Sequence, residues 1–132
     1  MVLHYLGHAG WLFEEGGTTL VCDPWLSQQG AFYASWFQFP ANDHVRLPRE
    51  VDAIYISHAH EDHFDPETLT QFPRDTLILI ANFNDPVLFE ELDSLGFTNV
   101  RLLPDGEPAR LGCFWLQIFR DEDSGMCIMT AP

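Results

Sequence analysis

The chain has few basic residues and no long apolar run. Of its 132 residues, six are Lys or Arg and twenty are Asp or Glu, so the formal net charge is −14. This balance disfavours nucleic acid as a partner, because nucleic-acid binding depends on Lys and Arg neutralising phosphates. No apolar run approaches the roughly 20 residues of a membrane span. The first residues, Met-Val-Leu-His-Tyr, lack the pattern of a signal peptide. We therefore expect a cytoplasmic protein without a membrane span.

Cysteine is also scarce. Cys22, Cys113 and Cys127 are far apart, odd in number and form no C-x-x-C pair. This usage is typical of reduced, buried thiols in a cytosolic protein.

Apolar residues make up 46% of the chain, which is enough for a core, and the length fits one domain covering residues 1–132.

The strongest chemical signal lies between Ser57 and His63. Three imidazoles and a carboxylate occur there, directly after the apolar run 53–56: His58, His60, Asp62 and His63. Imidazole suits zinc, iron and copper and carboxylate suits harder cations, so this mixture favours zinc first, with iron or manganese as alternatives. Residues two apart in extended chain project to the same side, so His58 and His60 can share one ion. A turn would aim Asp62 and His63 at a second ion.

The ordinary explanation of this stretch would be a solvated histidine-rich loop or the remnant of an affinity tag. A tag is a homogeneous histidine run at a terminus, whereas these residues are mixed and internal. Four closely spaced ligands after a strand therefore favour a dinuclear metal site. Two ions about 3.5–4 Å apart can bridge a water molecule and generate hydroxide near neutral pH.

The motif resembles the H-x-H-x-D-H signature of the metallo-β-lactamase superfamily. Two upstream segments are similar to the opening of one of its branches: residues 6–13, Leu-Gly-His-Ala-Gly-Trp-Leu-Phe, and residues 19–26, Thr-Leu-Val-Cys-Asp-Pro-Trp-Leu. That branch contains ascorbate-phosphate lactonases, phosphodiesterases acting on N-acyl-ethanolamine phospholipids, and sialic-acid-hydroxylase-like proteins. The resemblance extends to about residue 105. It is specific to the superfamily and not to one substrate.

The resemblance implies an α/β fold, a four-layer αβ/βα sandwich. Such domains are normally much longer than this chain and take further ligands from downstream, so we expect residues 1–132 to be the N-terminal half of one. The matching Asp in the superfamily steadies the metal loop by hydrogen bonding, which predicts a supporting role for Asp23.

No histidine follows His63, although many relatives place another ligand to the first metal near residues 120–125. Here that segment is acidic. We interpret it either as a hairpin loop with solvated acids or as a source of a carboxylate ligand from Asp121, Glu122 or Asp123. A carboxylate there would shift the preference from zinc towards iron.

Periodicity and turn residues predict alternating strands and helices, an α/β order. The expected strands are 2–6, 11–13, 18–22, 51–56, 76–80, 99–103, 113–119 and 126–130. A short helix should follow the cap at Asp65 and run to Gln71, and a second should follow Asp85 and run to Leu95. Leu88, Leu92 and Leu95 share one helical face, which indicates core packing.

The segment 27–50 has few periodic signals but many aromatic residues: Phe32, Tyr33, Trp36, Phe37 and Phe39. They would either line a binding surface or pack beneath the loop. His8 lies between small residues before a strand, and we expect it to support the metal site or lie at the surface rather than bind metal. His44 is expected to be a solvated loop residue.

The leading functional hypothesis is a metal-dependent hydrolase. His58 and His60 would hold one ion, and Asp62 and His63 the other, although Asp62 could instead orient the bridging water. Lactones, esters and phosphodiesters are the candidate small-molecule substrates. One alternative is a diiron oxygenase-like domain, indicated by the acidic residues 121–123. Another is a chain that is inactive alone and needs a missing half or a second copy in a homo-oligomer.

Overall fold

The structure is a computed structural model that describes residues 1–121 and 124–130. Within these residues the strands, in chain order, are β1 (Val2–Gly7), β2 (Gly10–Glu15), β3 (Thr18–Cys22), β4 (Ala53–Tyr55), β5 (Ile78–Ala81), β6 (Val100–Leu103), β7 (Ala109–Leu111), β8 (Phe114–Arg120) and β9 (Ser124–Thr130). The helices are α1 (Pro66–Leu69), between β4 and β5, and α2 (Pro86–Ser94), between β5 and β6.

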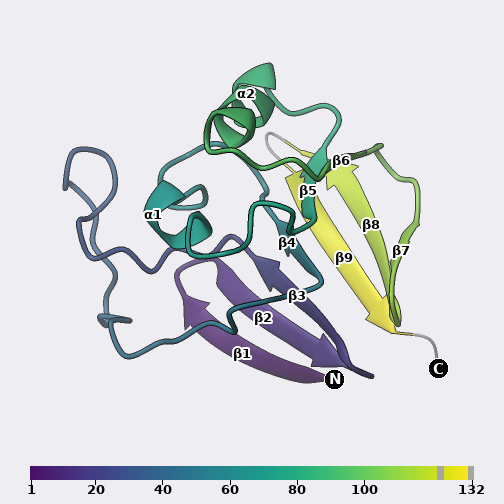
Figure 1. The fold of residues 1–132 in the computed structure, drawn as a ribbon, viewed down its shortest axis with the longest axis horizontal. Helices are drawn as coiled ribbons and strands as arrows, with labels where there is room; N and C mark the ends of the chain where they lie inside the picture. The colour runs from purple at the N-terminus through teal and green to yellow at the C-terminus, as the bar shows by residue number, and fades with distance from the viewer. Residues whose placement is uncertain (122–123, 131–132) are drawn as a thin grey trace.

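The first six strands form one mixed sheet in chain order, and β7, β8 and β9 form a second, antiparallel sheet (Figure 1). β1, β2 and β3 pair antiparallel, whereas β3, β4, β5 and β6 pair parallel. The carboxyl ends of the four parallel strands therefore meet at one edge of the sheet, which is where open α/β sheets place their ligands.

Both faces of the central sheet are buried, which explains the continuous apolar runs in its parallel strands. On one face Ile54 and Ile78 join a core cluster with Leu69 of α1 and Leu92 of α2. On the other face Tyr55 joins a cluster that includes buried residues of β8. Helices thus cover one face and the second sheet covers the other, as Figure 1 shows. The predicted α/β class is confirmed.

Two details differ from the sequence-based expectation for the first helix. It ends at Leu69 rather than at Gln71, and Asp65 makes no side-chain cap to it. The Asp65 carboxylate instead accepts hydrogen bonds from the backbone N–H groups of Leu26 and Ser27 and from the Thr68 hydroxyl. These donors compete with the helix for the same oxygen. Asp65 therefore holds the segment after β3 against α1.

The second helix is as expected at its start. Asp85 accepts a hydrogen bond from the backbone N–H of Val87, 3.0 Å away. Leu88 and Leu92 are buried and Leu95 packs against the same cluster, so the predicted core face is confirmed. β7 was not predicted as a strand, because three residues carry too little periodicity.

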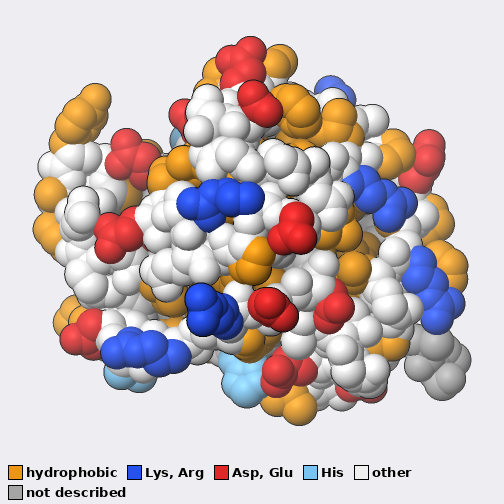
Figure 2. All heavy atoms as spheres, in the orientation of Figure 1, with side chains coloured by type: hydrophobic (Ala, Val, Ile, Leu, Met, Phe, Trp, Pro, Cys, Tyr) orange, Lys and Arg blue, Asp and Glu red, His pale blue; other side chains and the backbone are white. Residues whose placement is uncertain are grey.

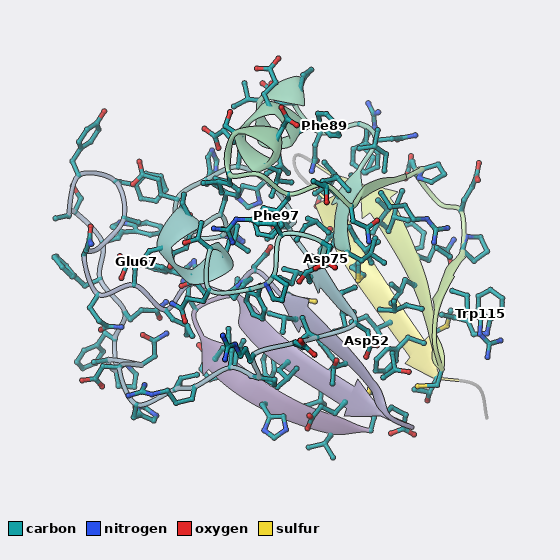
Figure 3. The ribbon with its side chains drawn as sticks, viewed as in Figure 1. Asp52, Glu67, Asp75, Phe89, Phe97 and Trp115 are labelled. Atoms are coloured by element: carbon teal, nitrogen blue, oxygen red, sulfur yellow. The ribbon has the colours of Figure 1, made fainter. Side chains whose placement is uncertain are left out.

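The surface is acidic and partly apolar. In Figure 2, acidic side chains are scattered over the visible face rather than gathered in one patch. Trp115, labelled in Figure 3, projects from β8 away from the central sheet and is 37% exposed. Among the described residues, no helix is long and apolar enough to cross a membrane.

Candidate metal centre

The motif loop leaves the carboxyl end of β4, between the ends of its two parallel neighbours. Asp23 follows β3 directly, and its backbone N–H donates to the carbonyl of Tyr55 at 3.0 Å. Beyond β5, Asn84 donates from its side-chain amide to the carbonyl of Ser57, also at 3.0 Å. The loop then turns, because the N–H groups of His63 and Phe64 both donate to the carbonyl of His60. Hydrogen bonds to residues that follow β3 and β5, the two strands beside β4, thus hold the loop on both sides.

Asp23 is the hub of the hydrogen bonds beneath the loop. Its carboxylate accepts from the backbone N–H of Ser57 at 2.8 Å and from the Ser57 hydroxyl at 2.6 Å. The same carboxylate lies 2.8 Å from Nδ1 of His63. Asp23 is only 6% exposed and has a φ of 42°, a conformation that Asp tolerates better than most residues. The expected support of the metal loop by Asp23 is confirmed as hydrogen bonding.

These hydrogen bonds determine the tautomers of two imidazoles. A carboxylate only accepts, so Nδ1 of His63 carries the proton that bonds to Asp23. The Ser57 hydroxyl already donates to Asp23, so in its 2.9 Å contact with Nδ1 of His58 it accepts. Both rings then carry their lone pair on Nε2, the atom available to a metal.

Asp62 and His63 lie together as the sequence predicts. Oδ2 of Asp62 is 3.4 Å from Nε2 of His63, and Asp62 is 5% exposed. Metal–ligand bonds of about 2.0–2.2 Å at angles between 90° and 109° place two ligands of one ion about 2.8–3.6 Å apart. A buried carboxylate and an imidazole lone pair that face each other repel, and a cation bound between them removes this repulsion. The pair therefore fits a metal ion.

His8 joins this pair from the turn between β1 and β2. Its Nε2 lies 2.7 Å from Oδ2 of Asp62. In the described part of the chain, one ligand atom each from His8, Asp62 and His63 forms a cluster within 4.8 Å, a spacing that could hold a cation. His8 was expected to support the metal site or lie at the surface; this geometry places it beside the motif, and its role stays a prediction.

His58 and His60 approach each other beside the pair. Their ring centroids are 4.7 Å apart, and the ring of His58 lies 4.0 Å from that of His63. The loop is not extended as the prediction assumed, because it bends at His60, yet the two rings still meet. The four predicted ligands are thus linked through contacts between neighbours, whereas the donor atoms found within 4.8 Å of one another in the described residues belong to His8, Asp62 and His63. Their assignment as ligands remains a prediction.

A cavity of about 440 Å³ opens next to His58 and His60. Its other walls come from the ends of β5 and β8 and the start of α2: Phe83, Asn84, Asp85, Val87, Leu88, Arg120 and Asp121. Of the three acidic residues proposed as an extra ligand, Asp121 therefore shares a cavity with the paired imidazoles. Glu122 and Asp123 lie outside the described residues.

The aromatic loop reaches the metal centre with two of its residues. Phe32 packs on the ring of His60 and Trp36 on that of His8, with centroid distances of 6.2 and 6.1 Å. The backbone N–H of Phe32 donates to the carboxylate of Glu61 at 2.6 Å, which ties the loop to the motif. Tyr33, Phe37 and Phe39 are mostly exposed, so the loop is not a satellite core. His44 is exposed, as expected.

Sequence reasoning missed the parts played by Ser57, Asn84 and Glu61. Ser57 directly precedes the first histidine, and Asn84 follows the next parallel strand, so strand order was a usable signal for both. The link between Glu61 and the aromatic loop had no such signal, because it joins positions 29 residues apart.

Cys22 lies at the end of β3, next to Asp23. Burial raises the pKa of its thiol well above the ordinary value, and the neighbouring charge of Asp23 raises it further. Cys22 and Cys113 are both free thiols. A buried neutral thiol is a poor metal ligand, because metals bind the thiolate. This agrees with the expected structural role of Cys22.

Comparison with known proteins places this geometry in a family. Residues 2–128 match the family model described as "Beta-lactamase superfamily domain". A mycobacterial protein named "Putative Rieske 2Fe-2S iron-sulfur protein" (Mycolicibacterium smegmatis) is 42% identical over 97 residues, 71% of this chain and 18% of that protein. The cytidine monophosphate-N-acetylneuraminic acid hydroxylase of Mus musculus is 33% identical over 108 residues, 77% of this chain and 18% of that protein.

A similar solved structure is that of CmlA, a diiron β-hydroxylase from Streptomyces venezuelae. It has a TM-score of 0.74 and 29% identity, and the match covers 98% of this chain and 27% of that one. The chain therefore spans less than a third of the length of each of these proteins.

Proposed function

The chain belongs to the β-lactamase superfamily, as its motifs predicted, and from that membership we propose that it forms the metal-binding part of a diiron hydroxylase. The observation that carries the proposal is the position of Asp121 in the cavity of His58 and His60, where the sequence offers no further histidine. An oxygen ligand beside two imidazoles favours iron over zinc. The similar structure of CmlA, named as a diiron β-hydroxylase, and the hydroxylase name of the Mus musculus relative support the same choice.

In this proposal His58, His60 and Asp121 hold one ion, and Asp62 and His63 hold the other. Asp23 and Ser57 keep the protons of His58 and His63 on Nδ1, so that both rings present Nε2 to the metals. Bound iron would supply the oxygen-activating chemistry, with dioxygen and two electrons from an external reductant as co-reactants. Phe83, Val87 and Leu88 give the cavity an apolar wall that would exclude water from a small organic substrate.

The first test is the metal content and oxygen consumption of the untagged 132-residue chain. We expect two iron ions per chain after anaerobic loading with Fe²⁺, a coloured product on exposure to air, and oxygen uptake that depends on added reductant. The variant Asp121→Asn should lose one ion, whereas the exposed Asp75→Asn should keep both. A colourless chain that retains only zinc under these conditions would contradict the proposal.

A second candidate function is hydrolysis by a dinuclear zinc site. The observation that favours it is the donor set itself, because three imidazoles with one carboxylate also match zinc. Lactones, esters and phosphodiesters remain the candidate substrates. The zinc-loaded chain should then hydrolyse a chromogenic ester or lactone, and His58→Ala should abolish that activity. If the zinc-loaded protein hydrolyses neither substrate and the iron-loaded protein consumes oxygen, the result supports the first proposal over this one.

A further inference from the structure

We propose that His8 is a positioning residue for Asp62 and not a metal ligand. Nε2 of His8 donates a hydrogen bond to Oδ2 of Asp62 and thereby orients the carboxylate towards the ion that it shares with His63. This inference rests on the metal assignment proposed above. It adds a residue that lies 54 positions before Asp62, outside the motif.

The distances from Asp62 to its two neighbours, His63 and His8, distinguish a fellow metal ligand from a hydrogen-bond donor. Two ligands of one ion lie about 2.8–3.6 Å apart, from bond lengths of about 2.0–2.2 Å. The 3.4 Å between Asp62 and His63 satisfies this spacing. The 2.7 Å between Asp62 and His8 lies below this spacing and is the length of a hydrogen bond from an N–H group to a carboxylate. His8 therefore donates its Nε2 proton to Asp62, and that nitrogen has no lone pair for a metal.

The surroundings of His8 fix its ring in this orientation. The residue has a φ of 50° in the tight turn after Gly7, whose φ is 110°. The Tyr5 hydroxyl donates to the carbonyl of His8 at 3.2 Å. Trp25 and Trp36 meet its ring edge-on, with centroid distances of 5.5 and 6.1 Å. Aromatic packing and backbone thus aim one imidazole nitrogen at Asp62.

The energetic consequence follows from the burial of Asp62. Its side chain is only 7% exposed, so solvent supplies little compensation if its partner is lost. A carboxylate that ligates a metal needs such a partner to fix its rotamer, and loss of the partner typically lowers metal affinity about 10–100-fold. His8 also contacts Trp36, so the same ring joins the aromatic loop to the metal centre.

The test separates the donor from the ring with two substitutions. His8→Gln keeps an N–H donor near the position of Nε2, and His8→Phe keeps the aromatic packing but has no donor. The exposed His4, paired with Glu14, provides the matched control His4→Ala. Affinity is measured by Co²⁺ titration against a competing chelator, with the ion count from elemental analysis.

For a positioning role we expect His8→Phe to keep the full ion count and to bind one ion about 10–100-fold more weakly. His8→Gln should recover most of that affinity, and His4→Ala should equal the unmodified chain. Loss of an entire ion in His8→Phe, as expected for Asp62→Ala, would make His8 a ligand and overturn the inference. Unchanged affinity in His8→Phe would overturn it as well.

A measurement on metal-free protein keeps this inference distinct from the proposed function. Two-bond ¹⁵N–¹H correlation spectra report which imidazole nitrogen carries the proton. We expect the Nε2–H tautomer for His8 and a shift of its Nε2 signal in Asp62→Asn. If the chain bound no metal at all, the proposed function would fail while this result could still stand. An Nδ1–H tautomer of His8 would overturn the inference by itself.

Discussion

At the scale of single residues, the carboxylate of Asp23 holds the loop of the metal centre in place through hydrogen bonds. Asp23 bonds to the Ser57 backbone, the Ser57 hydroxyl and the His63 ring, so three groups depend on its two oxygens. Both oxygens act as acceptors. An amide at this position would present a donor to at least one group that itself donates, and this mismatch makes the charge of Asp23 more important than its shape.

The substitution Asp23→Asn tests that dependence. Asn adopts a positive φ as readily as Asp, so the backbone at 42° should not be strained. We expect affinity for the ion at His63 to fall about 10–100-fold, because the His63 ring loses its charged acceptor. Isothermal titration with Co²⁺ measures this fall. Affinity equal to that of the unmodified chain would show that Asp23 does not set the His63 tautomer.

The raised pKa of Cys22 predicts a pH dependence of stability. In the unfolded chain the thiol ionises near its ordinary value of about 8.5, whereas in the folded chain it stays protonated to higher pH. The folded state then binds more protons, so this contribution to stability is complete below about 8.5 and declines above it. Urea unfolding at pH 7 and pH 9.5 should show a smaller loss in Cys22→Ala than in the unmodified chain. Equal losses in both proteins would contradict this assignment.

At the scale of elements, the link between Asp65 and the segment after β3 replaces the predicted helix cap. Asp65 is 5% exposed, and it accepts from two backbone N–H groups, at 3.2 Å from Leu26 and 3.0 Å from Ser27. Removing it would leave the part-buried N–H of Ser27 without this acceptor, and the N–H of Leu26 with only the Thr68 hydroxyl, 2.9 Å away. The short helix α1 therefore depends on this carboxylate for its position rather than for its start.

We expect Asp65→Ala to reduce the free energy of unfolding by about 1–3 kcal/mol, the cost of leaving a polar group without its hydrogen-bond partner. The control is Glu67→Ala on the same helix, an exposed position labelled in Figure 3 whose carboxylate accepts a surface hydrogen bond from Gln29. Urea titration followed by circular dichroism measures both. Similar midpoints for the two variants would rule out the anchoring role of Asp65.

Much of the element order was predictable from sequence, for identifiable reasons. The strand Thr18–Cys22 was predicted with its observed bounds, because a glycine pair precedes it and Asp23-Pro24 follows. The donors of the motif were predictable because they are neighbours in sequence. The contact of His8 with Asp62 and the cavity position of Asp121 were not, because each depends on the packing of segments far apart in the chain.

At the scale of the whole molecule, the excess of acidic groups makes bound cations stabilising. A formal charge of −14 produces self-repulsion in the compact state, and divalent ions at the motif would reduce it locally. Ions that bind only the folded chain add about 2.7 kcal/mol at 100 times their dissociation constant. We expect the midpoint of thermal unfolding to fall on dialysis against chelator and to recover with Co²⁺. No change on removal of metal would contradict a folded-state site.

The central claim is that one bend after a buried strand gathers His58, His60, Asp62 and His63 around metal ions. Its most direct test is the number of ions per chain, measured by native mass spectrometry on untagged protein. The account predicts two ions for the unmodified chain and one for the double variant His58→Ala with His60→Ala, with Asp62 and His63 retaining the other. An ion count that is the same in both proteins would contradict it.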